Sequence, residues 1–168
     1  MLWLRTRSET VDGIRIRGSE EFLLRSREAL ALLKSTSRFA EIRPNIALIS
    51  QGTRSGMKAW RGNPTFSVGE RTWKHSALWY AGAIAHDALH SKLYHEAKRS
   101  GGGTEPDPDA WTGGKAEKIC LAFQRRVLLE LGADDAIIAY IDECEKNPAY
   151  QGHKRGWRSW LDYLKRWW

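Results

Sequence analysis

Cysteine is scarce in this chain of 168 residues, which contains only Cys120 and Cys144. Two cysteines cannot form the dense disulfide framework of small secreted domains, so we expect free thiols and a cytoplasmic location. Long apolar runs are also missing, and no segment approaches the roughly 18 apolar residues of a transmembrane helix. Residues 1–7 have neither the apolar core nor the cleavage site of a signal peptide, so we expect no targeting segment.

Acidic residues are fewer than basic ones, with 20 Asp and Glu against 27 Lys and Arg and a formal net charge of +7. Such an excess permits contact with nucleic acid, anionic membranes or acidic proteins. The basic residues are spread along the chain and interleaved with acidic ones, which favours an ordinary solvated surface over a specific nucleic-acid site. The length suffices for a core without disulfides, so we expect a single domain over residues 1–168.

The hydrophobic pattern of the first half predicts one helix and a small set of strands. Residues 14–17 alternate as a short strand does, and Ser19 is a good start for a helix that ends near residue 34. Residues 42–50 and 65–68 are predicted to be strands, the second at the edge of its sheet. Residues 52–62 are either a loop or an irregular strand.

The second half is predicted to be helical, which makes the fold class α+β. A helix begins at Ser76 and runs to about residue 99, and a loop with five glycines covers residues 100–114. Helices at 115–131, 133–144 and 157–168 follow, the first of them ended by a glycine. We expect the glycine-rich loop to border any cleft near these helices.

Two histidines four residues apart mark the helix that begins at Ser76. His86 and His90 lie on one helical face, about 6 Å apart along the axis, so their imidazoles can share one metal ion. Zinc in hydrolytic enzymes takes three protein ligands and keeps a fourth position for water. Glu117, on the mostly apolar face of the next helix, is the best candidate for the third ligand. Asp87 can take a proton from the water and pass it to a leaving amine, so the predicted reaction is peptide-bond hydrolysis.

This arrangement resembles the gluzincins, small zinc-dependent metallopeptidases of the zincin clan with His-Glu-x-x-His on one helix and a glutamate ligand on the next. The resemblance covers residues 19–131 and implies a small mixed sheet packed on the active-site helix. It implies Zn²⁺ bound by His86, His90 and Glu117. It also implies a peptide or protein substrate, paired with an edge strand formed by Phe66, Ser67 and Val68.

Asp87 stands where the gluzincins have glutamate. Its side chain is one methylene shorter, so its oxygens would retreat by about 1 Å, and a displacement of that size can cost about 10²-fold in rate. Either the helix lies closer to the metal, or turnover is slow, or zinc binding persists without catalysis. The family's transition-state donor has three candidates in this chain, which are Tyr94, Tyr150 and His153.

Other interpretations remain open. His86 and Asp87 also form the doublet of the HD-type metal-dependent phosphohydrolases, an all-helical family in which Asp87 would itself bind the metal. A third hypothesis is a non-catalytic protein whose C-terminal helix contacts a membrane surface or a partner through an apolar stripe. The stripe consists of Trp157, Trp160, Leu161, Leu164 and Trp168. His86 and His90 also fit ordinary residues at the surface or at the edge of the core of an amphipathic helix. The C-terminal helix also fits a closing helix that packs on the domain.

Overall fold

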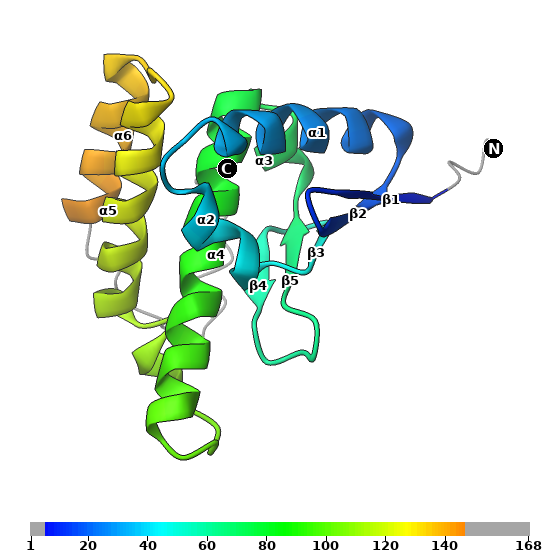
Figure 1. Ribbon diagram of the computed structural model, residues 1–168. Coiled ribbons are helices and arrows are strands. Elements are labelled where there is room, and N and C mark those ends of the chain that lie inside the picture. The colour runs from blue at the N-terminus through cyan, green and yellow to red at the C-terminus, as the bar shows by residue number, and fades with distance from the viewer. Residues whose placement is uncertain (1–5, 147–168) are drawn as a thin grey trace.

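A tight hairpin opens the described part of the chain, which in this computed structural model comprises residues 6–146 (Figure 1). Strand β1 (Arg7–Val11) pairs antiparallel with β2 (Ile14–Gly18). The two turn residues, Asp12 and Gly13, both have positive φ (49° and 83°), as a two-residue hairpin turn requires. The sequence predicted β2 but not β1, whose residues are mostly polar and exposed.

Helix α1 (Glu20–Lys34) begins where its sequence predicted. The Ser19 side chain accepts a hydrogen bond from the Phe22 N–H at 3.2 Å and so caps the first turn. The buried face of α1 packs toward the sheet and the central helix. Ser26 Oγ and the Tyr80 hydroxyl share a buried hydrogen bond of 2.9 Å across that contact.

The five-stranded sheet is mixed, with the strand order β1-β2-β3-β5-β4. Strand β3 (Leu48–Gln51) runs parallel to β2 and to β5 (Thr65–Val68), and β4 (Gly56–Lys58) pairs antiparallel with β5. The strand predicted over 42–50 therefore begins only at Leu48. A short helix, α2 (Phe39–Ile42), and a 3₁₀ turn at Arg43–Asn45 occupy the residues before it.

The prediction that residues 65–68 form an edge strand is wrong. Strand β5 has a hydrogen-bonded neighbour on each side, β3 and β4, so its main chain is already paired. Among the described residues, the edge on this side of the sheet belongs to β4. This strand lies within residues 52–62, which were predicted to be either a loop or an irregular strand.

Helix α4 (Ala77–Ser100) is the centre of the fold. It lies between the sheet with α1 on one side and the pair α5 (Gly114–Glu130) and α6 (Asp135–Lys146) on the other (Figure 1). Every residue from Trp79 to Ser91 is buried, as expected for a helix covered on several sides. A short helix, α3 (Glu70–Trp73), precedes α4. Ser76 caps the start of α4, because its side chain accepts a hydrogen bond from the Trp79 N–H at 3.0 Å.

The described chain is thus a mixed α+β fold of one five-stranded sheet and six α-helices. The loop after α4 holds a single 3₁₀ turn at Pro108–Ala110. Cys120 and Cys144 are both buried, and neither takes part in a disulfide in residues 6–146, as predicted. None of the helices in residues 6–146 combines the length and apolar character needed to cross a bilayer. The predicted helix at 157–168 lies outside the described residues.

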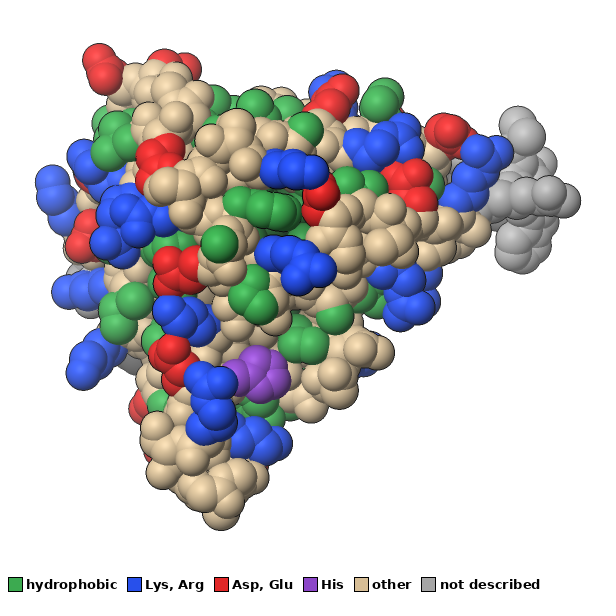
Figure 2. Space-filling model, viewed as in Figure 1, with side chains coloured by type: hydrophobic (Ala, Val, Ile, Leu, Met, Phe, Trp, Pro, Cys, Tyr) green, Lys and Arg blue, Asp and Glu red, His purple; other side chains and the backbone are tan. Residues whose placement is uncertain are grey.

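Charged side chains of both signs are mixed on the surface. On the face drawn in Figure 2, Lys and Arg lie interspersed with Asp and Glu. Several form exposed ion pairs, such as Arg27 with Glu9 at 2.8 Å and Lys34 with Asp12 at 2.6 Å. Such pairs contribute little to stability. This face has the ordinary solvated character expected from the interleaved charges of the sequence.

Candidate metal centre

Three side chains from two consecutive long helices converge at the α4–α5 contact. His86 and His90 are one turn apart on α4, and Glu117 lies near the start of α5. The two Nε2 atoms are 3.0 Å apart. Glu117 Oε1 is 3.4 Å from His86 Nε2, and Glu117 Oε2 is 3.2 Å from His90 Nε2. The convergence predicted for these three residues is therefore present, and they form a group that can bind a metal ion.

These separations suit a shared cation. Two ligand atoms at about 2.0–2.2 Å from a tetrahedral zinc lie about 3.3–3.6 Å apart, close to the distances between the imidazole nitrogens and the carboxylate oxygens. Without a cation, two imidazole nitrogens at 3.0 Å need a proton between them, since otherwise their lone pairs would face each other. Two imidazoles with one carboxylate are a donor set that fits zinc.

The triad is largely removed from solvent. The exposed fractions of the side chains are 4% for His86, 10% for His90 and 13% for Glu117. Burial opposes ionisation of Glu117, but the nearby His86 and His90 outweigh it and hold the pKa of the carboxyl well below its usual range. Burial likewise opposes the charged form of His90, yet Cys120 and Glu117 together raise the pKa of this imidazole. The site therefore favours positive charge next to an ionised carboxylate, as a metal site must.

His90 is oriented by a backbone group that the sequence did not point to. Its Nδ1–H donates to the Trp111 carbonyl at 2.6 Å. Because a carbonyl can only accept, this bond places the proton of a neutral His90 on Nδ1 and leaves Nε2 free to act as a ligand. Trp111 belongs to the loop between α4 and α5, and its ring packs 5.2 Å from that of Tyr94. The expectation that this loop borders the site is met.

Asp87 lies beside the triad and faces the sheet edge. Only 9% of Asp87 is exposed, and the backbone of Met57 in β4 has a minor influence on the pKa of its carboxyl. Burial raises the pKa of Asp87 to about 6, although the charges of His86 and His90 act in the opposite direction. Asp87 is not a member of the group of converging ligands found in the described residues. It is placed to hold or release a proton near neutral pH.

The structure does not support a substrate-pairing role for the residues that the sequence assigned to it. Phe66 and Val68 are fully buried in β5, and Ser67 pairs with Ser50 on one side and Gly56 on the other. Their main chain has no free edge for a peptide. The described strand that has a free edge and contacts α4 is β4.

The three candidates for a transition-state donor have different outcomes. The Tyr94 hydroxyl donates to the Glu105 carboxylate at 2.9 and 2.8 Å, so it anchors the loop after α4. Tyr150 and His153 lie outside the described residues. Cys120 is fully buried close to His90, burial raises the pKa of its thiol, and it is not a member of the converging group found in the described residues.

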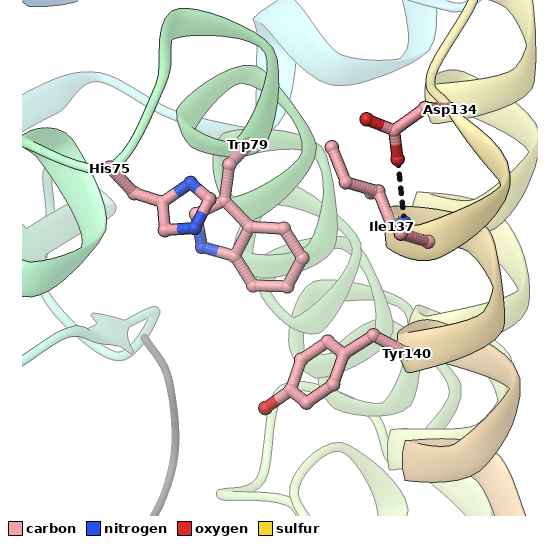
Figure 3. A pocket seen from close by; sticks show the side chains of 6 residues that line it. His75, Trp79, Asp134, Ile137 and Tyr140 are labelled. Atoms are coloured by element: carbon pink, nitrogen blue, oxygen red, sulfur yellow. Dashed lines mark hydrogen bonds between the residues drawn. The ribbon is translucent and has the colours of Figure 1, made fainter.

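A second concave feature lies at the other end of α4. It is an open pocket of about 410 Å³, in which Trp79 and Tyr140 approach each other with ring centroids 5.6 Å apart (Figure 3). Asp134 caps α6 there by accepting from the Ile137 N–H at 2.9 Å. His75 borders this pocket, its ring 5.7 Å from that of Trp79, and so it is not part of the triad.

No protein-family model matches this chain, and comparisons with curated proteins and with solved structures give no match either. The capacity of the triad to bind a metal ion is evident from its geometry and its donor set.

Proposed function

We propose that this protein is a zinc-dependent peptidase with a zincin-like fold. The observation that carries the proposal is the buried convergence of His86, His90 and Glu117, whose imidazole nitrogens and carboxylate oxygens are 3.0 to 3.4 Å apart. Asp87 follows His86 directly on α4 and adds a second carboxyl group beside them. Zinc bound there would act as a Lewis acid that activates water and polarises a carbonyl group.

The arrangement of elements around the triad supports this proposal. The resemblance to gluzincins implies a sheet packed on the helix that carries the histidines and a glutamate on the following helix. The mixed sheet, α4 and α5 follow that order. In this proposal β4 (Gly56–Lys58), rather than β5, is the edge strand that binds substrate, because β4 is at the end of the sheet and contacts α4. An extended peptide would add to β4 by main-chain hydrogen bonds.

The residues of the chain would divide the work as follows. Asp87, ionised at neutral pH, takes a proton from the attacking water and returns it to the amine nitrogen as the peptide bond breaks. The Trp111 carbonyl keeps the His90 ring turned toward Glu117.

The HD-type phosphohydrolase is the weaker hypothesis. That family is all-helical, whereas this chain has a five-stranded sheet before α3 and the histidine helix. It also needs Asp87 as a ligand, and Asp87 is not a member of the converging group found in the described residues. The hypothesis of a non-catalytic interaction protein depends on residues 157–168, which lie outside the described part of the chain.

Metal analysis and a cleavage assay test the proposal together. Purified wild-type protein should contain about one zinc per chain, and His86→Ala and Glu117→Ala should each lose it. Asp87→Asn should keep zinc and lose cleavage of a casein-type substrate. Zinc retained by both ligand variants would contradict the site. Phosphate release from a nucleotide panel without peptide cleavage would favour the phosphohydrolase instead. Zinc binding without either activity would contradict the peptidase and retain the metal site.

A further inference from the structure

Trp60 is an exposed aromatic side chain next to the proposed active site. Four large hydrophobic residues of the described chain are exposed, and Trp60, with 53% of its surface accessible, is the single aromatic among them. It follows β4 by two residues, in the segment that leads to β5. The preceding residue, Ala59, is fully buried, which anchors the backbone at the base of the indole.

Two contacts connect Trp60 to the metal centre. Its ring meets that of Trp111 edge to face, with centroids 5.9 Å apart, and the Trp111 carbonyl accepts the hydrogen bond from His90. On the other side, β4, which ends two residues before Trp60, contacts α4, the helix that carries Asp87. Trp60 thus lies in the turn just after β4, the strand proposed to pair with substrate, and touches the loop that orients a metal ligand.

We propose that Trp60, supported by Trp111, forms a subsite that binds a bulky apolar or aromatic side chain of the peptide substrate, an inference that rests on the proposed peptidase function. A peptide paired with β4 projects alternate side chains to each face, so a side chain near the cut would meet the exposed indole. Covering that indole removes apolar surface from water on both partners, and aromatic rings gain further from edge-to-face packing. The substrate class is therefore peptides with a large apolar residue near the scissile bond.

Matched peptides that differ by one residue measure this preference. Each peptide carries either Phe or Ala at one position, and the position is moved along both sides of the cut. The zinc-loaded wild type should favour Phe over Ala by about 10-fold in kcat/KM at one position. In Trp60→Ala this ratio should fall to about 1. Leu24→Ala, which removes a side chain of similar exposure from α1, is the control and should keep the wild-type ratio.

Binding gives a second measurement that does not need turnover. Zinc-loaded Asp87→Asn should bind the Phe peptide about 10-fold more tightly than the Ala peptide in calorimetry, and the added Trp60→Ala change should abolish the difference. Equal cleavage of both peptides by wild type would overturn the subsite and leave the peptidase intact. Trp60-dependent binding without cleavage by wild type would refute the peptidase and retain the subsite. A protein that neither binds nor cleaves these peptides would refute both.

Discussion

Replacing Glu117 by glutamine tests the metal centre with the smallest change in shape. The two side chains have the same length, so the glutamine amide can occupy the same space between His86 and His90. The substitution removes the negative charge and turns one oxygen into an NH₂ group, which can donate but cannot bind a cation. Any effect therefore comes from the chemistry of the ligand rather than from a cavity.

The expected loss of zinc affinity follows from the number of ligands. Structural zinc sites with four protein ligands bind with about 10–16 kcal/mol at neutral pH, or about 2.5–4 kcal/mol per ligand. Loss of the single carboxylate from this three-residue site should therefore weaken zinc binding by about 10²- to 10³-fold. The two carboxylate contacts, 3.4 Å to His86 and 3.2 Å to His90, both depend on the lost charge.

The metal-free protein should also become less stable, in a pH window fixed by the two pKa shifts. Glu117 has a lowered pKa, so its contribution is full above the unfolded value of 4.5 and is lost as the pH falls through the folded value. His90 has a raised pKa, so its contribution is full below 6.5 and is lost as the pH rises through the folded value. Glu117→Gln should cost about 1.5–3 kcal/mol between these pH values and less at alkaline pH.

Competition with a chromogenic chelator measures the zinc affinity, and urea unfolding of the metal-free protein measures the stability. Glu130→Gln is the control, because Glu130 lies on the same helix but accepts hydrogen bonds from Ser37 and Arg38 at the surface. It should leave the zinc affinity unchanged. If Glu117→Gln binds zinc as tightly as wild type, Glu117 is not a ligand and the geometric argument fails.

Three further predictions concern the same helices. Because the pKa of His90 is raised, zinc must displace a proton below that value, and the affinity should fall about tenfold per pH unit on acidification, measured by chelator competition across pH. Asp87→Asn should lower kcat by about 10²- to 10⁴-fold while zinc is retained. Burial raises the pKa of Asp87 to about 6, and a bound cation lowers this pKa again. The acidic limb of the wild-type kcat/KM profile should therefore lie at or below about pH 6. Gln124 is fully buried, and neither amide atom has a hydrogen-bond partner in the described chain, so Gln124→Met should stabilise the protein by about 1–3 kcal/mol in urea unfolding. The same change at Gln51, whose Oε1 accepts from the Ser19 N–H at 2.7 Å, should destabilise it by about 1 kcal/mol.

The features that the sequence predicted well are those encoded locally. Ser19 and Ser76 each precede an apolar periodic segment, and each caps the helix that it was expected to begin. The spacing of His86 and His90 placed both on one helical face regardless of tertiary context. Glu117 could be ranked as their partner because a carboxylate on an apolar face needs a compensating charge.

The features that the sequence missed depend on pairing between distant segments. Strand β1 is held by its register with β2, and its own residues are polar apart from Val11. Whether β5 lies inside the sheet or at its edge depends on β4, a strand of three residues that contains a glycine. The Trp111 carbonyl had no sequence signal at all, since a backbone group is present at every position.

The alanine-rich composition of α4 serves its packing as much as its helicity. Small residues on this helix let α5 approach closely, and a Cβ added at Gly82 would lie 2.9 Å from the Leu128 side chain. Glu117 lies on α5 about three turns before Leu128, so the spacing between the helices at Gly82 also sets how far the carboxylate must reach toward His86 and His90. A bulkier face on α4 would move α5 outward and take Glu117 away from the imidazoles. The small residues of α4, Gly82 among them, thus also allow two histidines and a glutamate to share one centre.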